Sequence, residues 1–179
     1  SPISLTDENG EWVKKTVKRY DKNCKLIPPY KFWIKAKTIE ITYTIHNAKF
    51  YNGSNEGPSP DALLKAAQDV QKDIEGNLTT STNKKGQTII TGVIFATPIE
   101  VVNDLENVVS SGSKSDNLIY ITDIDVLRNI TKVWGATGFN YLGENMMVLD
   151  IDEGRIRNKN LHHKGVPSHE LLHGLGLNH

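Results

Sequence analysis

The spacing of hydrophobic and polar residues predicts strands and helices that alternate along most of the chain. In residues 38–50 apolar side chains occur at every second position, a period typical of a half-buried strand. They are Ile39, Ile41, Tyr43 and Ile45. The Gly-, Ser- and Pro-containing residues 52–58 predict the turn that ends this strand. In the polar segment before it, Trp12, Val13, Val17 and Tyr20 have the spacing of a short helix, which Pro28 and Pro29 would end.

A longer helix is predicted for residues 59–76. Ser59 suits the N-cap position, Pro60 suits the first helical position and Gly76 suits the end. Apolar residues recur at helical spacing, so one side of this helix should pack in the core. These residues are Leu63, Ala67, Val70 and Ile74.

Shorter elements follow in the second half of the chain. Residues 87–97, 118–122 and 146–151 are rich in β-branched or other apolar residues and predict buried strands, whereas residues 99–109 suit either a short helix or a strand. Residues 123–134 predict a helix that Asp123 caps. The chain is therefore expected to fold as an α+β domain.

The last eleven residues contain the pattern that most clearly predicts a metal-binding and catalytic site. His169 and His173 are four residues apart, so on a helix both imidazoles project from one face and can bind the same metal ion. Imidazole nitrogen suits zinc. Glu170 lies beside His169 and can reach a water molecule at the metal without binding the metal itself, which suits a general base.

A third ligand is predicted three residues beyond a glycine. Gly176 can end the helix and turn the chain, so that His179 returns toward the metal. Three histidines leave one coordination position open for water, as in a hydrolytic zinc site. The five residues His169, Glu170, His173, Gly176 and His179 match every fixed position of H-E-x-x-H-x-x-G-x-x-H, and here the chain resembles the metzincin clan of zinc metallopeptidases.

The resemblance implies a fold, an activity and a cofactor. The fold would be a zincin-like or metzincin-like upper subdomain, with a twisted mixed sheet, a backing helix and an active-site helix. Residues 38–179 would form this catalytic domain, and residues 1–37 an N-terminal brace or a remnant of a pro-segment. The activity would be zinc-dependent hydrolysis of peptide bonds in a protein or peptide substrate, with Zn²⁺ held by His169, His173 and His179.

The same resemblance suggests where a substrate binds. Residues 135–145 are glycine-rich and precede the strand at 146–151, so they resemble the edge strand that borders the metzincin cleft. An exposed sheet edge can pair with an extended peptide, although an ordinary hairpin explains the pattern equally well. The candidate substrate-binding residues are Phe139, Asn140, Tyr141, Leu142 and Gly143.

Metzincins continue past the third histidine into a smaller subdomain with a methionine-containing turn beneath the metal. The sequence stops at His179, and both Met146 and Met147 precede the predicted active-site helix. Two explanations stay open. The chain is part of a longer protein, or it is a minimal form of the fold.

The amino-acid composition limits the possible binding partners and the cellular location of the protein. The 179 residues contain 21 Lys and Arg and 21 Asp and Glu, so zero net charge gives no sign of a nucleic-acid partner. Apolar runs are too short to span a bilayer. The family resemblance favours a secreted, bacterial protein. The only cysteine, Cys24, should be a small buried residue rather than a thiolate that keeps the enzyme latent.

Two other functions fit the same residues. The chain could be an inactive zinc-binding module that recognises protein partners, although binding alone has no use for Glu170. It could also be a peptidase toxin domain of a larger secreted bacterial protein. Cleavage of a specific target-cell protein would distinguish the toxin from a general peptidase.

Overall fold

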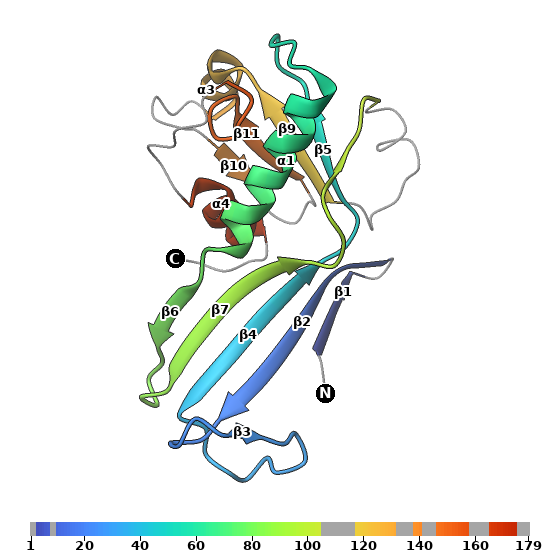
Figure 1. The fold of residues 1–179 in the computed structure, drawn as a ribbon. Helices are drawn as coiled ribbons and strands as arrows, with labels where there is room; N and C mark the ends of the chain where they lie inside the picture. The colour runs from blue at the N-terminus through green and yellow to red at the C-terminus, as the bar shows by residue number, and fades with distance from the viewer. Residues whose placement is uncertain are drawn as a thin grey trace.

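The computed structural model describes residues 3–7, 10–104, 117–131, 138–140, 146–157 and 165–174. Within them the chain is an α+β protein, as the sequence predicts, with two β-sheets rather than one (Figure 1). The first sheet has the strand order β1-β2-β4-β7-β6, and β3 pairs with β2. Its strands are β1 (Ile3–Asp7), β2 (Gly10–Tyr20), β3 (Leu26–Ile27), β4 (Thr38–Ile45), β6 (Thr79–Thr82) and β7 (Thr88–Phe95). Most pairs in this sheet are antiparallel, whereas β4 and β7 are parallel.

The second sheet has the strand order β10-β11-β9-β5-β8. Its strands are β5 (Ala48–Asn52), β8 (Glu100–Val101), β9 (Asn117–Thr122), β10 (Gly138–Asn140) and β11 (Met146–Asp150). Four of them are parallel, and β10 runs antiparallel to β11 at the edge. This sheet is therefore mixed, as predicted.

Three helices complete the described structure: α1 (Pro60–Glu75), α3 (Ile124–Thr131) and α4 (Val166–Gly174). The predicted start of α1 is confirmed, because the Ser59 side chain accepts a hydrogen bond from the backbone N–H of Ala62. Gly76 ends α1, and its N–H donates to the carbonyl of Lys72 at 2.9 Å. The strands expected at 87–97, 118–122 and 146–151 are present as β7, β9 and β11.

One hydrophobic core joins α1 and α4 to both sheets. On α1, Ala67, Val70 and Ile74 of the predicted stripe are fully buried, and Leu63 is partly buried against the core. The remaining buried members come mainly from one end of β4 and β7, from β5, β9 and β11, and from α4: Tyr43, Ile45, Val93, Phe50, Ile119, Ile121, Met147, Leu149, Leu171 and Leu172. In Figure 1 the other end of the first sheet extends away from the helices.

The single strand predicted for residues 38–50 is wrong, because the chain bends between β4 and β5 and enters the second sheet. Asn47 has a φ of 52°, in the left-handed region that asparagine tolerates better than most residues. Buried Asn117 of β9 holds the bend. Its side-chain amide donates to the carbonyl of His46 at 2.7 Å, and its backbone N–H donates to the carbonyl of Asn47 at 3.1 Å.

The short helix predicted around Val13 and Val17 is also wrong. These residues lie in β2, which pairs with β4 from Val13 to Tyr20. Helical spacing of four apolar residues cannot outweigh this pairing, because the β-branched residues Val13, Thr16 and Val17 also suit a strand.

Cys24 is exposed, so its predicted burial is wrong. It has a φ of 58° in the turn after β2, where Asp21 accepts hydrogen bonds from the backbone N–H groups of Asn23 and Lys25. In the described part of the chain, no helix has the length and apolar composition needed to cross a membrane. The division of the chain at residue 37 stays a prediction.

Candidate active site

The helix predicted around His169 is present as α4, and its start is fixed by backbone geometry. Gly165 precedes it with a φ of 97°, a conformation that residues with a Cβ rarely adopt. The carbonyl of Gly165 accepts a hydrogen bond of 2.9 Å from the N–H of His169. A Cβ at Gly165 would lie 2.8 Å from Nδ2 of Asn77, so the start of α4 approaches the segment after α1 closely.

One side of α4 is buried. Pro167 and Ser168 in the first turn are buried, and Leu171 and Leu172 in the next turn belong to the core. Ser168 Oγ lies 3.5 Å from the backbone carbonyl oxygen of Asp73 in α1. The packing of this side determines which residues of α4 face outward.

The residues of α4 that are predicted to bind zinc or to act as the general base lie on its other side. His169 is exposed and Glu170 is half-buried. The backbone of His173 belongs to α4, one helical turn after His169, so both residues start from the same side of the helix. The side chain of His173 and all of Gly176 and His179 lie outside the described residues. Among the residues described, no group of three or more His, Cys, Asp or Glu is placed to hold a metal ion, and the zinc site stays a prediction.

The predicted substrate-binding segment begins in β10. Phe139 and Asn140 belong to this strand and pair with Val148 and Met147 of β11. β10 also contacts α4. Within the described strands, β11 is its only neighbour, so its outer side is a sheet edge next to the helix. Tyr141, Leu142 and Gly143 lie outside the described residues, and the role of the segment in substrate binding stays a prediction.

A buried charged cluster at the end of β11 was not predicted from the sequence. Asp150 at the end of β11 and Glu153 and Arg155 in the turn that follows are all buried. The Arg155 guanidinium lies 3.6 Å from the carboxylate of Asp73 in α1. The cluster therefore connects β11 to the same turn of α1 that contacts Ser168 of α4. A sequence signal for it is the direct succession of these charges after a buried apolar strand.

Burial changes the acidity of this cluster. The pKa of Glu153 is raised from 4.5 to about 7, first by desolvation and then by the negative charge of Asp150, while Arg155 opposes the shift. The pKa of Asp150 is also raised by burial, although hydrogen bonds from the backbone N–H groups of Glu153 and Asp152 oppose this. Glu153 is thus a buried carboxyl that changes charge near neutral pH.

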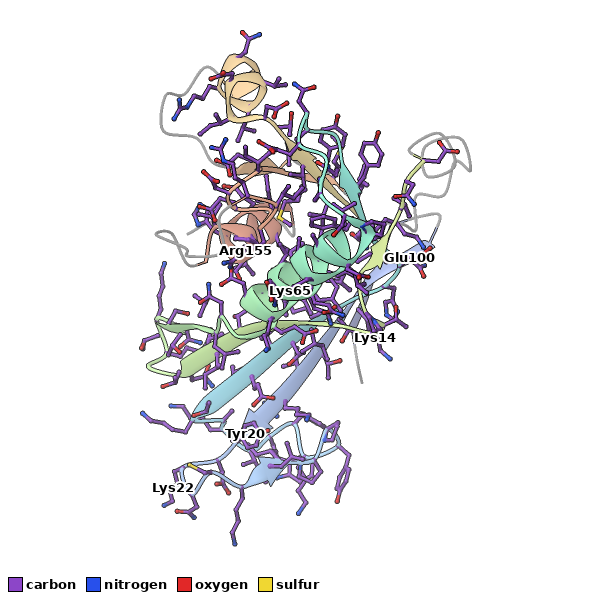
Figure 2. The ribbon with its side chains drawn as sticks, turned by 45° about the horizontal axis from the view of Figure 1, so that its top comes forward. Lys14, Tyr20, Lys22, Lys65, Glu100 and Arg155 are labelled. Carbon is purple, nitrogen blue, oxygen red and sulfur yellow. The ribbon has the colours of Figure 1, made fainter. Side chains whose placement is uncertain are left out.

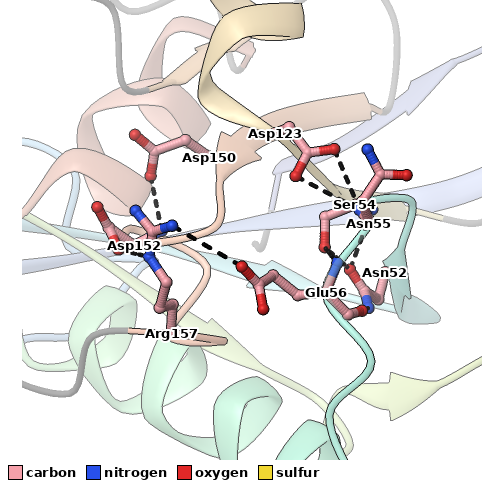
Figure 3. Close-up of polar contacts among 8 residues, drawn as sticks. All are labelled: Asn52, Ser54, Asn55, Glu56, Asp123, Asp150, Asp152 and Arg157. Atoms are coloured by element: carbon pink, nitrogen blue, oxygen red, sulfur yellow. Dashed lines mark hydrogen bonds and ion pairs between the residues drawn. The ribbon is translucent and has the colours of Figure 1, made fainter.

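A second polar network joins the loop after β5 to the same turn (Figure 3). Arg157 lies between two carboxylates, 3.6 Å from Asp152 and 3.8 Å from Glu56. On the other side of this loop, Asp123 accepts a hydrogen bond from the backbone N–H of Asn55. These contacts connect loops that follow three different strands of the second sheet.

Comparison with known proteins adds no relative, because no family model, curated protein or solved structure matches the chain. The functional assignment therefore depends on the residues of α4 and their surroundings.

Proposed function

We propose that the chain is a zinc-dependent endopeptidase whose chemistry is carried out by residues of α4. The observation that supports the proposal best is that His169, Glu170 and His173 belong to one helix whose opposite side is packed in the core. A helix anchored in this way can hold two imidazoles and a carboxylate in fixed relative positions, as a catalytic site requires.

The residues present fit a zinc ion. His169 is exposed on α4, and His173 follows it by one helical turn, the spacing at which two imidazoles can share a metal. His179 would provide the third nitrogen ligand. Zinc, when bound, would lower the pKa of a water molecule and polarise the carbonyl of the scissile bond.

Glu170 would act as the general base and acid. Its carboxylate would accept a proton from the attacking water and return that proton to the amine of the leaving product. Glu170 is next to the first predicted ligand and half-buried, so it can reach a substrate while being partly shielded from solvent.

The mixed second sheet, the backing helix α1 and the active-site helix α4 support the finer assignment of a metzincin-like upper subdomain. In this arrangement the extended substrate would pair with the outer edge of β10, beside α4. Phe139 and Asn140 would contribute backbone hydrogen bonds from this strand.

The proposal is tested by measuring zinc content and peptide cleavage on the same samples. The unmodified chain should bind one zinc ion per molecule and cleave a denatured protein such as casein. His169→Ala and His179→Ala should lose zinc, whereas Glu170→Gln should keep zinc and lose at least ~100-fold in cleavage rate. Glu56→Gln, on an exposed loop, is the matched control and should behave like the unmodified chain.

The outcomes separate the alternatives. No zinc in the unmodified chain would overturn the metalloenzyme. Stoichiometric zinc without cleavage of any protein would favour the inactive zinc-binding module. Cleavage restricted to a single protein of a target cell would favour the peptidase toxin, and secretion from a bacterium likewise stays a prediction.

A further inference from the structure

The far end of the first sheet carries an exposed group of large apolar side chains, called here the aromatic tip. Its members are Leu26, Tyr30, Phe32 and Trp33, with exposed fractions of 57%, 69%, 77% and 68%. They lie in the connection between β2 and β4, at the end of the molecule opposite α4 (Figure 1). Leaving such side chains in water is unfavourable, and adjacent exposed apolar groups indicate a surface that contacts something else.

Lysines flank the aromatic tip along the chain and in a neighbouring turn, and form what we call the lysine rim: Lys22, Lys25, Lys31, Lys35, Lys37, Lys84 and Lys85. The last two come from the β6–β7 turn, which lies beside the tip because the carbonyl of Ala36 accepts a 2.9 Å hydrogen bond from Gln87. Asp21 is the only acidic residue in residues 21–39. The chain as a whole has zero net charge, so the positive charge is concentrated locally.

The connection that carries the tip is held by its own contacts. The guanidinium of Arg19 donates to the carbonyl of Ile34, and the N–H of Lys31 donates to the carbonyl of Pro28 at 2.9 Å. Ile27 and Ala36 are buried beneath it, and the rings of Phe32 and Trp33 pack edge to face with centroids 5.4 Å apart. The aromatic side chains are thus presented outward on a structured support.

We propose that the aromatic tip and the lysine rim dock the protein on the surface of an anionic lipid bilayer. Tryptophan and tyrosine favour the interface between headgroups and acyl chains, where the ring is in an apolar layer and the polar edge stays hydrated. Lysine stems can cover apolar surface while their ammonium groups contact lipid phosphates and carboxylates. Two such signals together give stronger anchoring than either alone.

Charge argues against a second copy of the chain as the occupant. Two identical tips facing each other would bring two lysine rims together, and like charges across an interface oppose association. Lipid headgroups with negative charge are complementary to the same surface. In Figure 2, Tyr20 and Lys22 lie at the tip end, whereas Arg155 lies well away from them beside the helices, so docking at the tip leaves α4 away from the bilayer.

The test is co-sedimentation of the full chain with vesicles of phosphatidylcholine alone or mixed with phosphatidylserine. The chain should bind the mixed vesicles and not the neutral ones. Phe32→Ser with Trp33→Ser should weaken binding roughly tenfold or more. Lys25→Gln with Lys35→Gln should weaken it roughly twenty-five-fold at low salt, at about fivefold per lysine.

Matched control variants test whether binding depends on the aromatic tip and the lysine rim rather than on any exposed apolar or charged residue. Leu64→Ser with Val126→Ser removes exposed apolar side chains from α1 and α3, and Lys65→Gln with Lys72→Gln removes two charges from α1. Both controls should bind as the unmodified chain does, and all variants should unfold at the same urea concentration. Tryptophan emission should shift to shorter wavelength on mixed vesicles, and Trp33→Phe should abolish this shift.

Three results would overturn the proposal. These are absence of binding to mixed vesicles, binding that the tip variants leave unchanged, and Trp33-dependent self-association or RNA binding in place of vesicle binding. None of them depends on peptidase activity, so the membrane proposal and the proposed enzyme can fail separately.

Discussion

The guanidinium of Arg155 lies 3.6 Å from the carboxylate of Asp73, and both side chains are largely buried. The backbone carbonyl of the same Asp73 is 3.5 Å from Ser168 Oγ in α4. One turn of α1 therefore contacts both the turn after β11 and the first turn of α4. Substitutions in this buried pair should therefore affect α4, although neither residue belongs to that helix.

Arg155→Met should destabilise the protein by about 3 kcal/mol, because it leaves the Asp73 carboxylate buried without its partner. The free energy of unfolding in urea measures this. Arg157→Met is the control, since Arg157 is exposed and its ion pairs are in solvent, where such a change has an effect within about 0.5 kcal/mol. Equal effects of the two changes would contradict the importance of the buried pair.

Stability should fall as pH rises from about 4.5 to about 7 because of Glu153. Its pKa is 4.5 without the fold's influence and about 7 in the folded protein, so below pH 4.5 both states hold the proton. Between these values the folded state alone binds the proton, and stability decreases by roughly 3 kcal/mol as pH rises through this range. Above the folded pKa the contribution is constant.

Glu153→Gln keeps the shape of the side chain and removes its ionisable carboxyl group. Urea unfolding at several pH values should show a flatter profile for the variant and greater stability than the unmodified chain above pH 7. The variant keeps the other charged residues that influence the pKa of Glu153 in the folded protein: Asp73, Asp150, Asp152 and Arg155. Glu56→Gln on the exposed loop should leave the profile unchanged, and an identical profile for Glu153→Gln would contradict the assignment.

Elements with their own local signals were predictable from sequence. Ser59 and Pro60 mark the start of α1, and its buried stripe has regular helical spacing, so no distant contact is needed to define the helix. The start of α4, with Gly165 before it and Pro167 in its first turn, follows similar rules. The positions of His169 and Glu170 on this helix were therefore predictable, whereas the predicted ligands His173 and His179 have side chains outside the described residues.

Features that depend on distant partners were missed. The division between β4 and β5 depends on Asn117, which is about 70 residues away along the chain and holds the bend through hydrogen bonds. The strand β2 is defined by its pairing with β4, whereas its own apolar spacing resembles a helix. Burial of Glu153 was missed as well, because the succession of charges after a buried strand does not show that this turn lies near Asp73 of α1.

Gly165→Ala should weaken the attachment of α4 by about 1 to 3 kcal/mol, because alanine is strained at a φ of 97° and its Cβ would lie 2.8 Å from Asn77. Unfolding in urea measures the loss. Adding Asn77→Ala removes the close contact and keeps the backbone strain, so it should recover part of the stability. Gly57→Ala is the control, with no atom within 4 Å of the new Cβ, and it should be nearly neutral.

Asn117→Ala should destabilise the junction of the two sheets. The change removes the 2.7 Å hydrogen bond to the carbonyl of His46 and leaves that carbonyl without this donor at the bend, at a cost of about 1 to 3 kcal/mol. Asn55→Ala removes an exposed amide and should change stability by less than about 0.5 kcal/mol. Asn47→Gly should be tolerated and Asn47→Val should not, because a β-branched residue resists a φ of 52°. Urea unfolding of the four variants tests the bend, and similar stabilities for Asn117→Ala and Asn55→Ala would show that Asn117 does not hold it.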